Sequence, residues 1–395
     1  MGWLIFGGDD LARSMLKVGI ECESIEERET WGVGRIINRL LAELAQRPEL
    51  QKEFKFFLYF KSKIPDHPYL ASPLFTKRIV RLPFLPLSFS LYYYFLLPVR
   101  LYFENLDLMY FPNYMLPIIS RGRSLVTLTE DIHYEMSFGN LPLRYRLAYR
   151  VFANWAAKHA TSLMAMSESS KKNIADLFKI SPDRISVNHL GIDLPFTNYH
   201  LPITNYQLPI TNYLFYVGQA FPRRHLRETI LAFEEIAPQF SDLQFIAIGK
   251  DKYNPPIIAG LVESANRRLG REAVIHKDYV SDAELIDLYT KAKCLVYVSS
   301  KEAFGLPPLE AALLGTAPVV SLEGATKEIL GDGAIYVDNP DSVDQIAQAM
   351  AKALTANPDR LVLASRTKQI LDQYSWRAHA DRFLAIIRSL VNNAL

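Results

Sequence analysis

Short apolar runs alternate with amphipathic stretches along the whole chain. Apolar runs predict buried strands, whereas apolar residues spaced three and four apart predict helices. In the first half, the predicted strands are 17–20, 54–59, 106–111, 125–128 and 162–166. In the second half, they are 214–217, 243–248, 273–276, 294–299 and 318–321. Strands that alternate with helices are typical of parallel sheets covered on both faces, so we predict an α/β fold with two doubly wound, Rossmann-like units.

Two stretches show helical spacing most clearly. The first, 36–45, follows the first predicted strand. The second, 376–391, closes the chain, and its apolar residues are Phe383, Ile386, Ile387 and Leu390. We expect this last helix to pack back on the N-terminal domain.

A repeat with the pattern Thr-Asn-Tyr-x-Leu-Pro-Ile separates the two halves. It begins at Thr197 and Thr204 and breaks off after Tyr213. Its prolines exclude a coiled coil, because they remove helix donors, so we interpret the repeat as an insertion in the interdomain connection. The predicted organisation is a possible extension (1–14), an N-terminal domain (15–193), a linker (194–213), a C-terminal domain (214–375) and a final helix (376–395).

Composition narrows the function classes. The 395 residues carry 44 Lys and Arg against 42 Asp and Glu, and this balance of +2 argues against nucleic acid as a partner. Only two cysteines occur, without metal-ligand spacing, so we expect neither a disulfide framework nor a zinc site. Charged residues near the N-terminus break any secretory core, and prolines interrupt the apolar run 82–99. We therefore expect a cytoplasmic protein, and binding at the inner face of the membrane stays open.

The segment 294–315 is the most informative for chemistry. It predicts a buried strand, a turn with a glycine, and a helix with two prolines at its start. The N-terminus of a helix has unpaired N–H groups and a positive dipole end. We therefore expect the backbone around Phe304, Gly305 and Leu306 to hold a diphosphate.

Two glutamates flank this turn. Glu310 falls early in the predicted helix, where its carboxylate can accept hydrogen bonds from ribose hydroxyls, and Glu302 lies at the carboxyl edge of the sheet. The run from Glu302 to Ala311 resembles the Glu-x7-Glu signature of the retaining nucleotide-sugar glycosyltransferases of family four. That resemblance implies the GT-B fold, in which two Rossmann-like domains face a central cleft. The alternative is that both glutamates are ordinary surface charges.

A second stretch supports the same family. Residues 216–226 resemble its Val-Gly-x-x-x-Pro-Arg-Lys-Asn-Leu segment, with Gly218 after the strand and Arg224 at the usual lysine position. The resemblance implies that Arg223 and Arg224 neutralise the diphosphate of the donor. Two surface arginines at a helix start are the alternative, although the helix dipole disfavours cations there.

Two further stretches concern the N-terminal domain. Gly32 and Gly34 resemble the family's Gly-Gly-Ile-Gly-Arg element, which implies a backbone approach to the donor, although a structural turn explains them as well. The family often has His-Asp where this chain has Glu130 and Asp131, and the nearest imidazole is His133. Three outcomes stay open: an altered sugar contact, a polar role taken over by Asp131 and His133, or reduced activity.

The resemblance implies a retaining hexosyltransferase without metal or cofactor. Its donor is a nucleoside diphosphate sugar, with GDP-mannose as the first prediction and a UDP-hexose as the second, and its acceptor is a glycan or a lipid-linked glycan of cell-surface polysaccharide synthesis. Glu302, Arg223 and Arg224 are the predicted catalytic residues. The alternatives are a degenerate nucleotide-sugar-binding scaffold, or a GT-B epimerase or phosphorylase. The missing Gly-x-Gly-x-x-Gly pattern disfavours a nicotinamide enzyme.

Overall fold

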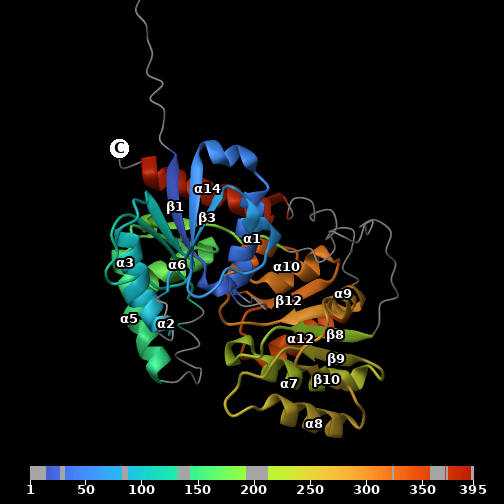
Figure 1. The fold of residues 1–395 in the computed structure, drawn as a ribbon. Coiled ribbons are helices and arrows are strands. Elements are labelled where there is room, and N and C mark those ends of the chain that lie inside the picture. Colours follow the sequence, from blue (N-terminus) through green and yellow to red (C-terminus); the bar gives the residue numbers. More distant parts are fainter. Residues whose placement is uncertain are drawn as a thin grey trace, which may run out of the picture. The chain divides into compact units, whose positions relative to one another are not determined.

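The computed structural model describes residues 15–26, 32–81, 88–130, 133, 143–192, 212–322, 324–355, 370 and 372–392. The chain divides into two compact units. The first comprises residues 1–126, 159–162 and 384–395, and the second comprises residues 127–158 and 163–383. Two parallel sheets with helices between their strands confirm the predicted α/β class (Figure 1). The predicted extension 1–14 and most of the repeat lie outside the described residues.

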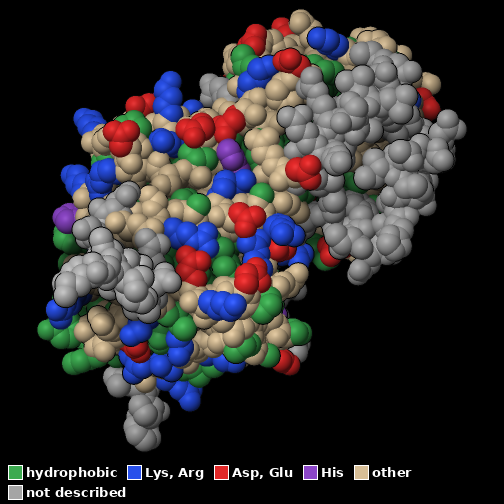
Figure 2. All heavy atoms as spheres, turned by 90° about the horizontal axis from the view of Figure 1, so that it is seen from above, with side chains coloured by type: hydrophobic (Ala, Val, Ile, Leu, Met, Phe, Trp, Pro, Cys, Tyr) green, Lys and Arg blue, Asp and Glu red, His purple; other side chains and the backbone are tan. Residues whose placement is uncertain are grey.

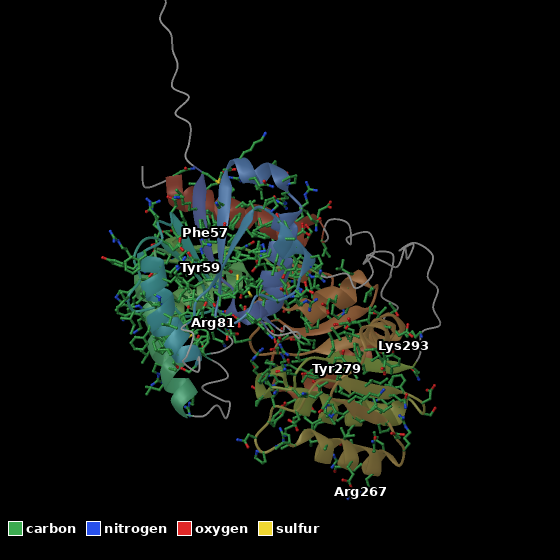
Figure 3. The ribbon with its side chains drawn as sticks, in the orientation of Figure 1. Phe57, Tyr59, Arg81, Arg267, Tyr279 and Lys293 are labelled. Atoms are coloured by element: carbon green, nitrogen blue, oxygen red, sulfur yellow. The ribbon has the colours of Figure 1, made fainter. Side chains whose placement is uncertain are left out.

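The first sheet has seven strands in the order β3-β2-β1-β4-β5-β6-β7. Its strands are β1 (Leu16–Glu21), β2 (Phe54–Phe60), β3 (Phe75–Ile79), β4 (Leu108–Phe111), β5 (Ser124–Thr127), β6 (Ser162–Ala165) and β7 (Ile185–Val187). The helices along this part of the chain are α1 (Val33–Ala45), α2 (Phe89–Leu91), the π-helical turn η4 (Tyr92–Leu96), α3 (Leu97–Tyr102), α5 (Leu143–His159) and α6 (Glu168–Phe178). Phe57 and Tyr59 are buried on β2 (Figure 3).

The second sheet has six strands in the order β10-β9-β8-β11-β12-β13. Its strands are β8 (Tyr213–Val217), β9 (Gln244–Ile248), β10 (Val274–Lys277), β11 (Cys294–Tyr297), β12 (Ala317–Ser321) and β13 (Ile335–Val337). Its helices are α7 (Leu226–Ile236), α8 (Ile258–Leu269), α9 (Asp282–Lys291), α10 (Leu306–Leu313), α11 (Ala325–Leu330) and α12 (Val343–Thr355). This doubly wound order places β8 beside β11, although three helices and two strands separate them in the sequence.

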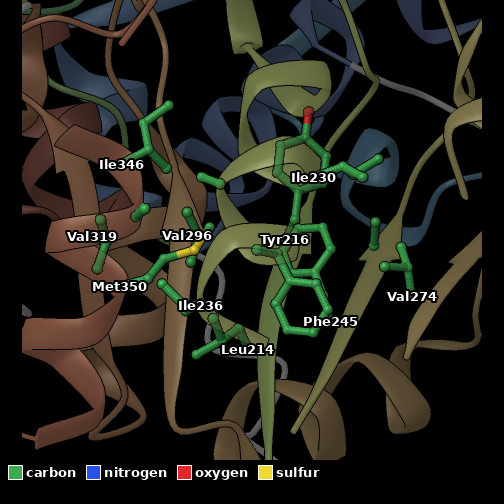
Figure 4. Close-up of a cluster of buried hydrophobic side chains, with 14 of the residues drawn as sticks. Leu214, Tyr216, Ile230, Ile236, Phe245, Val274, Val296, Val319, Ile346 and Met350 are labelled. Carbon is green, nitrogen blue, oxygen red and sulfur yellow. The ribbon is translucent and has the colours of Figure 1, made fainter. Parts of the chain in front are cut away.

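The side chains of β8 point alternately to the two faces of the second sheet, and helices cover both faces. Leu214 and Tyr216 belong to a buried cluster with apolar residues of α7, α8 and α12 (Figure 4). Phe215 points the other way and packs edge-on against Tyr289 of α9, with 5.2 Å between the ring centroids. Successive side chains of a strand point to opposite faces, so an uninterrupted apolar run is what a strand covered on both sides requires.

Three strands were not expected from the sequence. β7 and β13 have only three residues each, too few to show a pattern. β3 is a five-residue strand at the end of the sheet order. Only its first residue, Phe75, is buried, and the strand carries the charges of Lys77 and Arg78. Edge strands tolerate such charges. A strand with charged residues forms no apolar run, so the sequence pattern does not predict it.

The helix expected at the end of the chain is present as α14 (Trp376–Asn392). Phe383 and Ile387 are fully buried. Within the first unit, Arg388 forms a bidentate ion pair with Glu53, and both N···O distances are 2.7 Å. The last turns of α14 thus contact Glu53, the residue that precedes β2.

Basic and acidic side chains are interspersed on the face seen in Figure 2, in keeping with the net charge of +2. Among the described residues, no helix is both long enough and apolar enough to cross a membrane.

Candidate active site in the second unit

The candidate site lies where β8 and β11 end. The two strands are parallel neighbours, with Cys294 opposite Leu214 and Leu295 opposite Phe215. Parallel neighbours end at the same edge of the sheet, so the segments that follow them meet there. The segment after β8 contains the 3-10 turn Pro222–Arg224, and the segment after β11 contains Glu302.

Glu302 is the centre of a buried polar cluster, which we call the Glu302 cluster: Glu302, Arg223, Arg224, Tyr297 and Ser299. Four donors converge on the same carboxylate oxygen, Oε1. The distances are 2.6 Å from Arg223 Nη1, 2.9 Å from Arg224 Nε, 3.0 Å from the Tyr297 hydroxyl and 3.1 Å from the Ser299 hydroxyl. Only 8% of Glu302 is exposed, so the carboxylate is held by protein groups rather than by bulk water.

The charges in this cluster determine its protonation. Burial by itself raises the pKa of the Glu302 carboxyl, but the charges of Arg224 and Arg223 outweigh it and lower that pKa to about 2. Burial opposes the charge on Arg224, and the attraction of Glu302 reverses this effect and raises the pKa of the guanidinium. At neutral pH the cluster therefore holds one carboxylate and two cations, which leaves an excess positive charge for an anionic ligand.

The two arginines are held differently. Arg223 also donates to the carbonyl oxygen of Lys301 at 2.7 Å, and its own carbonyl accepts from the Ser300 amide at 2.8 Å. Its side chain is 5% exposed, whereas that of Arg224 is 16% exposed. Arg223 thus ties the two segments together, and Arg224 is the more accessible cation.

Gly218 makes room for Arg224. Its φ is +132°, and a Cβ there would lie 2.9 Å from Arg224 Nη1. Gly249, at the end of β9, has a φ of +136°, and a Cβ there would lie 2.0 Å from the carbonyl oxygen of Gly218. Any side chain at either position would be strained and would displace the loop that carries the arginines.

The predicted diphosphate turn is present at the start of α10. Gly305 has a φ of +92° and is the N-cap residue, so Leu306 opens the helix. Pro307 and Pro308 have no N–H, so the first turn offers fewer amide donors than an ordinary helix start. The Phe304 ring is buried against Tyr374, with centroids 5.7 Å apart, which leaves only its backbone for a ligand.

Glu310 lies on α10, as predicted. Its Oε2 accepts a hydrogen bond of 2.8 Å from the hydroxyl of Tyr289 on α9. Glu310 is only partly buried. The tyrosine therefore orients a carboxylate that still reaches the surface.

A family model described as Glycosyl transferases group 1 matches residues 209–370. The mannosyltransferase B of the O-antigen chain in Escherichia coli is 28% identical over 55% of this chain and 58% of that protein. The O-antigen chain mannosyltransferase RfbU of Salmonella typhimurium is 26% identical over 70% of this chain and 73% of that protein. Residues 209–370 are a group 1 glycosyltransferase domain.

Solved structures extend the likeness to the whole fold. WaaG, a glycosyltransferase of lipopolysaccharide biosynthesis, superposes with a TM-score of 0.67 at 19% identity and covers 94% of this chain and 99% of its own. HepE of Anabaena, solved with UDP and glucose, gives a TM-score of 0.64 at 14% identity over 95% of this chain and 100% of its own. The predicted GT-B fold is thereby confirmed.

The structure places Glu130 outside the Glu302 cluster. Glu130 is buried, and its carboxylate accepts from the Ser170 hydroxyl at 2.5 Å and from Asn173 Nδ2 at 3.1 Å, both on α6. The residue that replaces the usual histidine thus supports a helix. Burial and the charge of Arg150 lower the pKa of His133, and Asp131 lies outside the described residues.

Gly32 and Gly34 belong to the first unit. Gly32 is the N-cap residue of α1 with a φ of +56°, and Gly34 is buried in the first turn. A Cβ on Gly32 would meet no atom within 4 Å, so its backbone conformation explains the glycine. A contact of either glycine with the donor stays a prediction.

Two members of the Glu302 cluster were missed in the sequence: Tyr297 and Ser299. Tyr297 ends β11, where it reads as one more apolar position of a buried strand. Ser299 precedes Glu302 by three residues, a spacing typical of a turn in which a hydroxyl reaches a later side chain. That spacing is the one signal that the sequence contained.

Proposed function

We propose that this protein transfers a hexose, with mannose as the first candidate, from a nucleoside diphosphate sugar to a hydroxyl of a glycan or lipid-linked glycan. The reaction retains the anomeric configuration, uses no metal ion and serves cell-surface polysaccharide synthesis in the cytoplasm. The observation that carries this proposal is the Glu302 cluster, where two cations and one carboxylate meet at the end of the sheet. The O-antigen mannosyltransferases among the relatives support mannose as the sugar. GDP-mannose is the corresponding first candidate for the donor.

The arrangement supplies the charges that such a transfer needs. The bond between the anomeric carbon and the diphosphate oxygen breaks, and a bond to the acceptor oxygen forms on the same face of the sugar. The acceptor proton passes to the departing diphosphate. Arg224 and the start of α10 stabilise the developing negative charge, whereas Glu302 binds sugar hydroxyls and stabilises the positive charge at the ring. Glu310 binds the ribose.

The positive charge of the arginines takes the place of a metal ion in this scheme. A guanidinium presents several N–H donors in one plane, which suits a diphosphate. The sequence has no Asp-x-Asp pair of the metal-dependent class. Activity in the presence of a chelator is therefore the expected behaviour.

The first experiment is calorimetry with GDP-mannose, UDP-glucose, UDP-N-acetylglucosamine and NADH, all with EDTA present, followed by product analysis. We expect GDP-mannose to bind and to release mannose slowly. Arg224→Gln should weaken this binding about tenfold or more. Arg267→Gln, which changes an exposed arginine on α8 (Figure 3), should leave it unchanged. Failure of every nucleotide sugar to bind the wild type would refute the proposal. Binding without turnover, even with glycan acceptors, would favour a catalytically inactive scaffold.

We further propose a peripheral contact with an anionic membrane, made in the first unit by an apolar patch: Phe95, Val99, Tyr102 and Phe103. These residues follow one another at helical spacing, and Phe95 and Phe103 are 64% and 80% exposed. Arg121 stacks on Tyr102, with its guanidinium carbon 5.2 Å from the ring centroid. Exposed aromatic residues beside cations suit a boundary between lipid tails and anionic headgroups.

Helix α5, in the second unit, combines the same two properties. Its 17 residues include no Asp or Glu. Leu147 and Val151 are at least half exposed, one turn apart, and Arg146 and Arg150 are exposed beside them. A cationic helix with exposed apolar residues binds anionic lipid surfaces through charge and burial together.

Vesicle sedimentation tests the membrane contact. The wild type should sediment with vesicles that contain phosphatidylglycerol and much less with phosphatidylcholine alone. The double variant Phe95→Ser and Phe103→Ser should stay in solution, and Tyr279→Ser, at an exposed aromatic residue of the second unit (Figure 3), should behave as the wild type. Equal sedimentation of both variants would rule out the apolar patch as the contact.

A further inference from the structure

Tyr297 contacts two other members of the Glu302 cluster. It is the last residue of β11 and is 1% exposed. Its hydroxyl donates to Glu302 Oε1 at 3.0 Å, and the guanidinium carbon of Arg224 lies 5.4 Å from its ring centroid. The ring also stacks on Tyr216, with centroids 6.2 Å apart and planes inclined by 23°. One side chain thus contacts both the carboxylate and the accessible cation.

We propose that Tyr297 is a positioning residue that fixes the carboxylate of Glu302 and the guanidinium of Arg224 before the donor binds. This inference rests on the function proposed above. Tyr297 itself touches neither sugar nor diphosphate; it acts through the two residues that do. Arg223 and Ser299 complete the same arrangement from the adjoining segments.

The hydrogen bonds to Glu302 support this role. Within the described ranges, every protein hydrogen bond to this carboxylate ends on Oε1. Four donors on one oxygen prevent the carboxylate from turning, and they leave Oε2 as the oxygen for a sugar hydroxyl. A carboxylate that is already oriented needs no reorganisation when charge develops at the sugar.

The ring of Tyr297 performs the second part of this role. An aromatic face attracts a guanidinium that lies over it. The N–H groups at the edge of that guanidinium stay free to donate hydrogen bonds. Arg224 uses Nε for Glu302, and its Nη1 is 3.3 Å from the Gln219 carbonyl oxygen, a long hydrogen bond that a diphosphate can replace. Gly218 leaves the space in which this stack forms.

The hydroxyl keeps its proton throughout the working pH range. Burial raises the pKa of the Tyr297 phenol far above its ordinary value, and the neighbouring arginines offset only part of this shift. Tyr297 therefore acts as a donor to Glu302 and never competes with it as an anion.

Tyr297→Phe tests the proposal, and Tyr216→Phe is the matched control. Both variants remove one hydroxyl from the same buried stack, but that of Tyr216 lies 3.4 Å from the Gln219 carbonyl oxygen and not on Glu302. With GDP-mannose, Tyr297→Phe should lower kcat about 10- to 100-fold and change KM less than about threefold, since a misplaced group costs rate rather than ground-state binding. Tyr216→Phe should leave both constants near the wild type.

A second measurement needs no activity. The free energy of unfolding is compared at pH 6 and pH 2 for both variants. Glu302 stabilises the fold above its unfolded pKa of 4.5, and this contribution disappears as the pH falls toward 2. In the fold the carboxylate stays ionised down to its pKa of about 2, so the hydrogen bond from Tyr297 to the ionised form weakens only there. The loss of stability caused by Tyr297→Phe should therefore be larger at pH 6 than at pH 2, and that caused by Tyr216→Phe should be the same at both.

These results separate the two proposals. If the wild type binds no nucleotide sugar but Tyr297→Phe shows the pH-dependent loss, the donor assignment fails and the link between Tyr297 and Glu302 stands. If Tyr297→Phe retains kcat within about twofold, or its loss of stability is independent of pH, the positioning role is refuted. Should Tyr297→Phe not fold, Ser299→Ala removes a donor from the same oxygen and must show the same pH dependence.

Discussion

Two buried glutamates, one in each unit, have opposite acidity. Glu302 follows β11 and has a pKa of about 2, whereas Glu21 ends β1 and has a pKa of about 8. Both are almost inaccessible to solvent. Burial raises the pKa of each carboxyl, so their partners make the difference. Two guanidiniums contact Glu302, whereas among the described residues the Glu21 carboxyl accepts only from the Glu23 amide at 2.8 Å and the Tyr92 hydroxyl at 3.1 Å.

The comparison shows that the strand end alone does not determine what a carboxylate can do. At neutral pH Glu302 is a fixed anion suited to binding hydroxyls and a developing cation. Glu21 keeps its proton, and the nearby carboxylates of Glu23 and Glu26 raise its pKa further. Lys61, a cation close by, pairs with Glu23 at 2.5 Å. Charge partners, rather than burial, assign the two glutamates their different roles.

Glu302→Ala should have the largest effect. We expect transfer to fall by at least about 100-fold, because the group that stabilises charge at the sugar is lost. The variant should also lose about 3 kcal/mol of stability, because two buried arginines lose their carboxylate. Steady-state kinetics and urea unfolding measure the two effects. Unchanged turnover in a folded Glu302→Ala variant would remove Glu302 from the mechanism.

Glu21→Gln should change stability in the opposite sense. In the unfolded chain this carboxyl ionises near pH 4.5, whereas in the fold it keeps its proton up to about pH 8. The unfolded state therefore binds fewer protons in this window, and the wild type loses stability there by up to about 1.4 kcal/mol per pH unit. Glu21→Gln should remove this slope, so its gain over the wild type should grow from pH 5 to pH 8. A gain that does not change with pH would contradict the raised pKa.

The two arginines of the Glu302 cluster should separate binding from rate. Arg224→Gln should weaken GDP binding about tenfold or more, since it removes the accessible cation. Arg223→Gln should leave GDP affinity within about threefold and lower kcat, since that side chain anchors Glu302 and the Lys301 carbonyl. Calorimetry with GDP and kinetics with GDP-mannose distinguish the two. Equal losses of GDP affinity would mean that both arginines contact the diphosphate.

The family motifs in the sequence named Arg223, Arg224 and Glu302 as catalytic residues, and the structure brings the three side chains together. The sequence could not predict which side chains would reach them. Tyr297 reads as a core residue, and the partner of Glu21, Tyr92, lies 71 positions away. Three-residue strands such as β13 leave no pattern at all.

Glu130 also shows that the sequence does not reveal the tertiary partners of a side chain. Its place in the motif suggested a sugar contact, and the structure gives its carboxylate two partners on α6. Ser167, by contrast, is the N-cap residue of that helix, and its hydroxyl accepts from the Ser170 amide at 3.0 Å. A cap depends on residues next to it in the sequence, whereas the partners of a buried carboxylate depend on the tertiary fold.

Tyr92→Phe should have the smallest effect and is the counterpart of Tyr297→Phe. It removes one hydroxyl from Glu21, as the other variant removes one from Glu302. The Tyr92 hydroxyl favours the ionised form of Glu21, so its loss should raise that pKa beyond about 8. The cost should be about 1 kcal/mol at pH 5 and pH 7 and larger at pH 9, where only the wild type stabilises the ionised carboxylate. Urea unfolding at the three pH values measures it. A cost that shrinks toward pH 9 would mean that the hydroxyl instead favours the protonated form, and the two glutamates would then differ in the sign of this contact as well as in their charge partners.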